Sequence, residues 1–268
     1  KVVYLDSQGV ASLSVSEFAS TCTDNSSISR LYLSDSIYDC TERGTRVIQL
    51  IASDPSGNKS VKSFLVNVLD TLSPEVFTKT ATIYIDTAGK ASLSVSQVLD
   101  SLYENCGGST VYLTKTEFSI KDIGENFVFA YAFDESGNRS KNIYAKVNVE
   151  IGDADRDSIP DYVEGAQDFD GDGIPNYRDY DSDNDGVLDR YENSGLKILL
   201  DLDQDGYYNV YDVDADGDKI FDVSEVYGFD PDQNGTVGIG RVTVNSRGIP
   251  VLANGGDGYG LLDTDNDG

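Results

Sequence analysis

Carboxylate side chains recur on alternate positions in the second half of this 268-residue chain. The clearest run consists of Asp181, Asp183, Asp185, Gly186, Asp189 and Glu192. Its order is D-x-D-x-D-G-x₅-E, the ligand order of a twelve-residue calcium loop. Carboxylates at positions 1, 3 and 5 approach one ion, the carbonyl oxygen of Val187 supplies position 7, and glycine at position 6 permits the sharp turn. The run therefore predicts a calcium site.

The same pattern recurs in one phase along the chain. The preceding loop has the candidate ligands Asp168, Asp170, Asp172, Ile174, Asn176 and Asp179. The following loops have Asp201, Asp203, Asp205, Tyr207, Asn209 and Asp212, then Asp214, Asp216, Asp218, Ile220, Asp222 and Glu225. A solvated, disordered acidic tail would not keep the glycines at one phase. One match alone is weak evidence, whereas four in register indicate a string of calcium loops.

Flanking runs depart from this pattern. The first contains Asp153, Asp155, Asp157, Ile159, Asp161 and Glu164, with Ser158 at the glycine position. A late run contains Asp230, Asp232, Asn234 and Thr236, and the sequence stops within another, Asp263, Asp265 and Asp267. The late run has Arg241 at position 12, so its ion would need a ligand from residues 236–262 or from water. Lys219 replaces glycine in the loop that begins at Asp214, and we expect it to weaken that turn.

The spacing of the loops excludes calcium loops flanked by helices. An EF-hand needs a helix on either side, but a single residue separates the last ligand of one loop, Asp179, from the first of the next, Asp181. The glycine-rich nonapeptide of calcium β-rolls is absent as well. The arrangement between Asp153 and Glu225 resembles the thrombospondin type-3 repeat, in which consecutive loops wrap a string of ions.

Charge is placed unevenly along the chain, whose net charge is −27. Residues 1–152 carry 13 basic and 18 acidic groups, and residues 153–268 carry 7 and 29. Self-repulsion opposes collapse of the acidic part, which is poor in large apolar residues. Five or six divalent ions would cancel about half of its charge, so we expect metal to substitute for a hydrophobic core. We expect neither nucleic acid nor anionic membranes as partners of such an acidic surface.

The first part of the chain, residues 1–151, is an internal duplication. Tyr4–Ser16 matches Tyr84–Ser96, and the same offset aligns Asp54–Ser60 with Asp134–Ser140. Within each copy, β-branched and aromatic runs alternate with turn residues every eight to twelve residues, roughly, which is typical of strands joined by tight turns. The Asp54 and Asp134 segments are predicted as such turns rather than as ligand sites.

These patterns predict a mainly β chain of three parts: two tandem Ig-like β-sandwiches and an irregular, calcium-stabilised type-3 repeat rod. The predicted divisions are residues 1–72, 73–151 and 152–268. We expect a radius of gyration well above the ~18 Å of a compact chain of this length. Both ends suggest a piece of a longer protein.

Catalysis within the chain is not expected. The sequence has no histidine, so there is no Ser-His or Cys-His pair, and the regular phase of the carboxylates assigns them to metal. No apolar run is long enough to span a bilayer. The three cysteines allow one disulfide and one odd thiol. Tyrosines of the acidic part, such as Tyr207 and Tyr208, are expected to pad a thin core, with a sugar-binding platform as the alternative.

The turn segments carry a second resemblance. Together with Asp70 and Pro74, and with the spacing from Asn105-Cys106-Gly107 to Asp122-Ile-Gly124, they look like the hyalin-repeat-type sandwiches of large Bacteroidota surface proteins. Such repeats often contain a cysteine pair. This chain departs from that pattern, because the second copy lacks the partner of Cys106 and the first has Ser26 where a partner of Cys40 is expected. The resemblance implies a Cys22–Cys40 bridge, with Cys106 as a buried thiol.

The resemblances together imply a stalk segment of a secreted, cell-surface adhesin of the gliding-motility type, exported by the type 9 secretion system to the exterior of the outer membrane. The implied partners are calcium, neighbouring repeats, the secretion or gliding machinery and surface polysaccharide, without membrane insertion. O-glycosylation is implied at Asp-Ser/Thr-apolar triplets such as Asp35-Ser36-Ile37. The alternative is an accessory region of a secreted polysaccharide-degrading enzyme.

Overall fold

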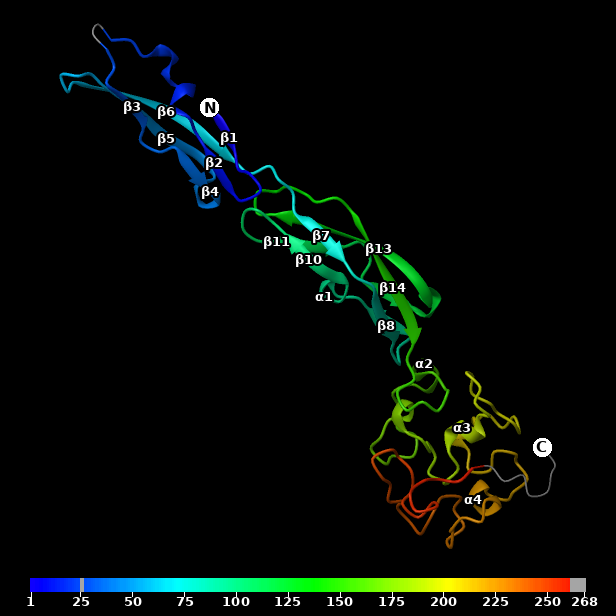
Figure 1. Cartoon of the computed structure of the whole chain (residues 1–268). Coiled ribbons are helices and arrows are strands. Elements are labelled where there is room, and N and C mark those ends of the chain that lie inside the picture. The colour runs from blue at the N-terminus through cyan, green and yellow to red at the C-terminus, as the bar shows by residue number, and fades with distance from the viewer. Residues whose placement is uncertain (25–26, 261–268) are drawn as a thin grey trace. The chain divides into compact units, whose positions relative to one another are not determined.

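The computed structural model of the chain describes residues 1–24 and 27–260 and is mainly β, as predicted (Figure 1). The described chain separates into two compact units. One comprises Lys1–Ala81, Ser94–Thr116 and Phe127–Val147, and the other comprises Thr82–Leu93, Glu117–Asn126 and the chain from Asn148 onward. The predicted three-part division stays a prediction.

The first copy of the duplication forms two facing sheets. Its strands are β1 (Val2–Tyr4), β2 (Val10–Ser12), β3 (Arg30–Leu33), β4 (Ile37–Asp39), β5 (Gly44–Ser53) and β6 (Lys59–Leu69). Its short 3₁₀ helices are η1 (Val15–Glu17), η2 (Ala19–Thr21) and η3 (Cys40–Glu42). One sheet has the order β1-β6-β5-β3 and the other pairs β2 with β4. Strand β1 runs parallel to β6, whereas β5 and β6 form a long antiparallel pair.

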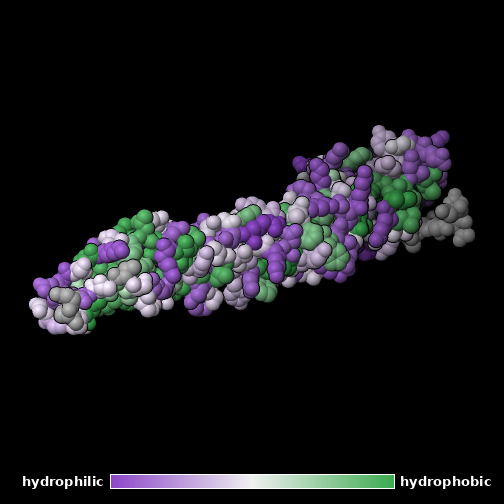
Figure 2. All heavy atoms as spheres, turned by 90° about the horizontal axis from the view of Figure 1, so that it is seen from above, coloured by the Kyte–Doolittle hydropathy of each residue, from purple (hydrophilic) through white to green (hydrophobic). Residues whose placement is uncertain are grey.

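Alternation of side chains along the long strands builds the core of the first sandwich. Ile48, Val66 and Val68 are fully buried, while Val47 and Leu65, one position away, are each 63% exposed. A period of two residues sends successive side chains to opposite faces of a sheet. On the face drawn in Figure 2, hydrophobic residues accordingly reach the surface between hydrophilic ones.

The second copy repeats this arrangement with an added strand pair. Its elements are β7 (Glu75–Thr78), β8 (Ala81–Ile85), β9 (Lys90–Ser92), α1 (Val95–Val98), β10 (Leu99–Tyr103), β11 (Ser109–Leu113), β12 (Glu117–Ser119), η4 (Ile120–Asp122), β13 (Gly124–Asp134) and β14 (Ile143–Ile151). The strand order is β11-β13-β14-β8 in one sheet, with β10 paired to β7 and β12 to β9. The predicted turns are present, since Gly57 and Gly137 have φ values of 89° and 88°.

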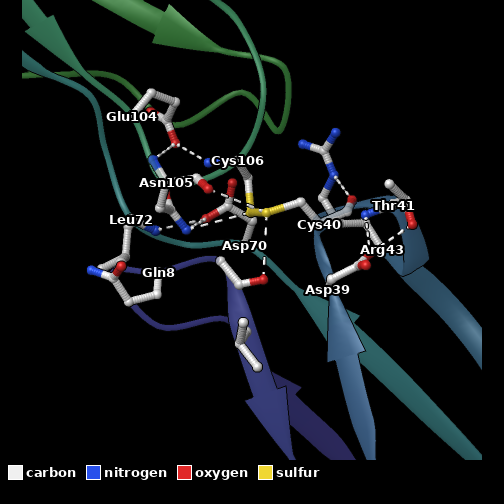
Figure 3. The surroundings of a disulfide bond; sticks show 12 residues. Gln8, Asp39, Cys40, Thr41, Arg43, Asp70, Leu72, Glu104, Asn105 and Cys106 are labelled. Carbon is white, nitrogen blue, oxygen red and sulfur yellow. Dashed lines mark hydrogen bonds between the residues drawn. A yellow bond between two sulfur atoms is a disulfide. The ribbon is translucent and has the colours of Figure 1, made fainter.

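The disulfide joins Cys40 to Cys106, so the predicted Cys22–Cys40 bridge is wrong (Figure 3). Cys40 follows β4, close to where β5 starts, and Cys22 lies beside Asp54 and Lys59, where β5 has ended. A strand of ten residues spans about 30 Å, whereas a disulfide needs Cα atoms within about 7 Å. Cys106, in the loop between β10 and β11, lies 5.3 Å from Cys40 between Cα atoms, and Cys22 stays a thiol.

Candidate metal centre

The acidic region, residues 153–260, contains a one-turn helix at the end of each complete loop. These turns are α2 (Asp161–Glu164), η5 (Asn176–Arg178), α3 (Asp189–Glu192), η6 (Asn209–Tyr211) and α4 (Asp222–Glu225). Each begins at the ninth position of its loop. Loops that end in glutamate close with an α turn, and loops that end in aspartate close with a 3₁₀ turn. The single turn swings the twelfth residue back toward the start of the loop without the long flanking helices of an EF-hand.

Backbone amides orient the carboxylates of each loop. The Ile159 amide donates to Oδ1 of Asp157 at 2.7 Å, and the Val187 amide donates to Oδ1 of Asp185 at 2.6 Å. Each of these aspartates thus uses one oxygen on an amide two residues later. The other oxygen, Oδ2, is buried and accepts no hydrogen bond from the protein.

The ninth position has a role that the sequence pattern did not reveal. Its side-chain oxygen accepts a hydrogen bond from the amide of the second position in every complete loop. The acceptors are Asp161, Asn176, Asp189, Asn209 and Asp222, at 2.7, 3.0, 2.8, 2.9 and 3.1 Å respectively. This bond fastens the start of the loop to its helical turn, so the ninth residue holds the loop closed whether or not it also contacts an ion.

The loop that begins at Asp181 forms the buried centre of this region. Every residue from Asp181 to Asp189 is buried. Oxygens of Asp181, Asp183 and Asp185 lie within 4.8 Å of one another, and Glu192, 3% exposed, closes the loop. A centre made of like charges is unstable unless a cation neutralises it.

Unsatisfied oxygens show that the donor set fits calcium. Both carboxylate oxygens of Glu164 and Glu192 are shielded from solvent and receive no hydrogen bond. Eight aspartates each have one carboxylate oxygen that is likewise shielded from solvent and receives no hydrogen bond. They are Asp155, Asp157, Asp172, Asp181, Asp183, Asp185, Asp201 and Asp222. Buried polar atoms normally have partners, and hard cations such as calcium take only oxygen ligands. These residues would hold the ions, which supply the charge that the protein part does not contain.

The electrostatics of the loops agree with that fit. Burial raises the pKa of Asp155 to about 9, of Asp179 to about 9 and of Glu164 to about 11. Burial also raises the pKa of Asp183 and of Glu192 well above the usual range, and neighbouring carboxylates add to the shift. Without cations, these groups therefore ionise at a cost that opposes folding.

Two loops that are not consecutive share one cluster. Asp157 and Glu164 belong to the loop that begins at Asp153, and Asp189 belongs to the buried loop. Oxygens of all three lie within 4.8 Å of one another, and all three residues are buried. The loops are therefore packed together through carboxylates rather than strung one after another as the sequence pattern suggested.

Residues 236–260 wrap the buried loop, a contact that the sequence did not indicate. The Tyr259 amide donates to the Gly186 carbonyl at 2.6 Å, and the Val237 amide donates to the Asn184 carbonyl at 3.0 Å. A Cβ atom on Gly186 would come within 2.6 Å of Val237, so only glycine fits. Leu188, Val223, Val237, Ile249 and Ala253 form a small apolar cluster beside it. Part of the segment that we considered, beside water, as a source of a ligand for the Asp230 loop thus covers the buried loop.

The remaining predicted ligands lie nearer the surface. Asp168, Asp170 and Asp172 converge within 4.8 Å but are exposed or half-buried, and burial raises the pKa of Asp170 to about 7. Asp203, Asp205 and Asp218 are exposed. In the Asp230 loop, Oδ2 of Asp232 accepts from the Gly240 amide at 2.9 Å. Asp263, Asp265 and Asp267 lie outside the described residues.

Tyrosines of the acidic region divide between the two roles considered for them. Tyr180 packs on the apolar cluster, and Tyr211 is half-buried beside Phe169, with ring centroids 5.1 Å apart. Tyr207 and Tyr208 are 57% and 45% exposed. Some of these rings therefore fill the core, whereas others remain at the surface.

Comparisons with known proteins bear on the fold alone. No family model matches the sequence, and no curated protein matches it. EC1-2 of human protocadherin-24 is 12% identical and covers 57% of this chain and 94% of that one, with a TM-score of 0.30. The fibronectin(III)-like modules of Clostridium thermocellum CbhA are 12% identical, covering 48% and 82%, with a TM-score of 0.21.

An endo-fucoidan hydrolase of glycoside hydrolase family 107, MfFcnA9, is 16% identical and covers 46% of this chain and 28% of that one, with a TM-score of 0.19. The sheets of this chain themselves confirm the sandwich fold, and its structural neighbours include fibronectin III-like and cadherin-like domains.

Proposed function

We propose that residues 153–260 bind several calcium ions and that these ions are their main source of folded stability. One observation carries the proposal: phased carboxylates present buried oxygens that receive no hydrogen bond, in loops whose backbone already holds them in place. The binding free energy of the ions would then be folding free energy. Weak, carboxylate-rich sites of this kind suit the millimolar calcium found outside cells.

Counting ions on the intact chain tests this proposal. Equilibrium dialysis against calcium chloride, followed by elemental analysis, is expected to give five or six ions per chain, with magnesium chloride as the comparison cation. A value of zero or one at millimolar calcium would overturn the proposal.

We further propose that the chain is a stalk segment of a secreted, cell-surface adhesin of the Bacteroidota gliding-motility type, with no catalytic activity of its own. Tandem sandwiches followed by calcium loops support this reading, as do the two resemblances of the sequence. The disulfide fits an oxidising compartment, and no helix among the described residues is long and apolar enough to cross a membrane. Antibody labelling and protease shaving of intact source cells are expected to find the chain outside the outer membrane; detection only after lysis would reject this placement.

The alternative, an accessory region of a secreted polysaccharide-degrading enzyme, is favoured by an aromatic row on the second sandwich. Tyr112 stacks on Tyr131 with centroids 5.6 Å apart, and the Arg139 guanidinium lies 4.1 Å from the Tyr131 centroid. Phe133, 37% exposed, lies edge-on to both tyrosine rings, with centroids 6.1 and 6.0 Å away, and Tyr144, 64% exposed, packs against Phe129. Such rings can stack on sugar faces. Binding of the chain to polysaccharide, if Tyr112→Ala abolished it, would favour the accessory-region function.

Glycosylation at the Asp-Ser/Thr-apolar triplets stays a prediction.

A further inference from the structure

Three carboxylates converge outside the acidic loops, at the segment that follows the first sandwich. Asp70 comes directly after β6, Glu104 directly after β10, and Asp134 is the last residue of β13. One oxygen of each lies within 4.8 Å of the others. Asp70 and Asp134 are 7% and 8% exposed. Glu104 is half-buried. Three strands distant in sequence thus deliver anionic groups to one point.

Hydrogen bonds fix the direction of each carboxylate. Asp70 accepts from the Asn105 side-chain amide at 3.2 Å and from the Ser136 hydroxyl at 3.1 Å. Asp134 accepts from the Asn138 backbone and side-chain amides at 2.7 and 2.8 Å. Figure 3 shows Asp70, Glu104 and Asn105 beside the disulfide. Such partners hold ligand oxygens in place before an ion binds.

Glu104 supplies the observation that points to a ligand. Its Oε1 accepts from the Asn105 and Cys106 amides at 2.8 and 3.0 Å. Its Oε2 is shielded from solvent and accepts no hydrogen bond from the protein. The nearby guanidinium of Arg43 is paired with Glu135 at 2.9 Å. A shielded anionic oxygen beside two buried carboxylates is costly unless a cation contacts it.

The first sandwich contains an internal comparison for this arrangement. Its equivalent turn makes the same bonds, since Asp54 accepts from the Asn58 backbone and side-chain amides at 2.9 and 2.8 Å. Asp54 nevertheless stays half-buried, whereas Asp134 is buried. The turn alone therefore does not account for the burial of Asp134 or for the two carboxylates gathered around it.

We propose that Asp70, Glu104 and Asp134 form a site, here called the junction site, that binds a hard divalent cation of the calcium class. The donor set consists only of oxygen atoms, which such cations require. The ion would tie the segment after β6 to the β10–β11 loop, the loop that the disulfide also holds through Cys106. The site is separate from the acidic loops and does not depend on the function proposed for them.

Local hydrogen–deuterium exchange tests the site in the intact chain. Peptides covering residues 69–73, 103–108 and 133–139 are followed during titration with calcium chloride, and with magnesium chloride in parallel. We expect calcium to protect all three. Glu104→Gln, which keeps the size of the side chain, is expected to raise the calcium concentration for half-maximal protection at least tenfold. Peptides covering residues 181–192 are expected to respond as in the wild type.

Glu135→Gln is the matched control, because Glu135 follows Asp134 but is a surface residue paired with Arg43. It is expected to leave the midpoint unchanged. Wild-type peptides here that do not respond to either cation, while residues 181–192 do, would overturn the junction site and leave the acidic loops as proposed. An unchanged midpoint in Glu104→Gln would also overturn it. A response here without one at residues 181–192 would support the junction site and refute the calcium loops.

Discussion

The first sandwich and the acidic region have interiors of opposite chemistry. The sandwich buries Ile48, Val66 and Val68, and removing these apolar side chains from water stabilises the fold. The acidic region buries Asp181, Asp185 and Glu192, and removing these carboxylates from water destabilises the fold unless a cation binds them. Both interiors are held by backbone hydrogen bonds. The difference predicts that the first sandwich folds without cations, whereas folding of the acidic region depends on the cations in the solution.

Removal of calcium should give the largest separation between the two regions. With EDTA, residues 153–260 are expected to lose most of their amide protection, because the buried carboxylates repel one another. The sandwich strands β5 and β6 are expected to keep theirs. Hydrogen–deuterium exchange with and without EDTA measures both in one sample. Equal protection of the acidic region in the two conditions would break the comparison.

Substitution of a single buried carboxylate should sharpen the comparison between the two regions. Glu192→Gln removes the charge of a buried carboxylate that we propose as a calcium ligand, so calcium affinity at its loop is expected to fall about tenfold, as measured by calorimetric titration. In EDTA the same variant is expected to be no less ordered than the wild type, since one buried charge is gone.

Ile48→Ala is the matched control in the other interior. It is expected to cost the first sandwich about 2–5 kcal/mol with or without calcium. If calcium changed the effects of both Glu192→Gln and Ile48→Ala, or of neither, the contrast between the two interiors would be contradicted.

pH should move the two regions differently when calcium is chelated. The folded-state pKa values of Asp157, Asp222 and Asp155 are raised by burial to about 6, 7 and 9. A raised pKa contributes stability below the unfolded value near 4, and this contribution is lost as pH rises through the folded value. In EDTA the acidic region is therefore expected to lose order between about pH 4 and 9. Near-UV circular dichroism of its tyrosines follows this; order that increases with pH would refute it.

The smallest expected effect is at the turn of the Asp214 loop. Lys219 stands at the glycine position with a φ of 81°, a conformation that costs residues other than glycine about 1 kcal/mol. Lys219→Gly is expected to stabilise the calcium-bound region by about that amount in thermal unfolding. Gln204→Gly, at a φ of 64° in the preceding loop, relieves the same kind of backbone strain outside the glycine position and is expected to stabilise by a similar amount. A lower melting temperature for Lys219→Gly would show that the lysine side chain is needed there.

The sequence revealed what is encoded by local spacing. Runs of β-branched and aromatic residues between turn residues predicted the strands of the sandwiches, and the regular spacing of the aspartates identified carboxylates that the structure brings together. The left-handed turns at Ser158 and Lys219 persist without glycine, because the surrounding aspartates fix the backbone on both sides.

Contacts between distant segments were not visible in the sequence. The partner of Cys40 is decided by the length of β5, which separates Cys40 from Cys22. Val237 and Tyr259 cover Gly186, but their segment lacks the regularly spaced acidic residues that would have indicated its position. The bond between the ninth-position oxygen and a backbone amide could not be predicted either, because aspartate and asparagine suit both an ion and an amide. Their assignment as ligands stays a prediction.

The parallel pairing of β1 with β6 has a consequence for how the first sandwich bears load. Val2 lies opposite Asn67 and Tyr4 lies opposite Leu69, and the Leu5 amide bonds the Leu69 carbonyl at 2.9 Å. Tension applied to the chain before β1 and after β6 pulls the two strands along their length in opposite directions. The hydrogen bonds between them lie across that direction, so all of them resist together in shear instead of opening one by one. The sandwich is thus loaded in its stronger geometry when the chain is stretched.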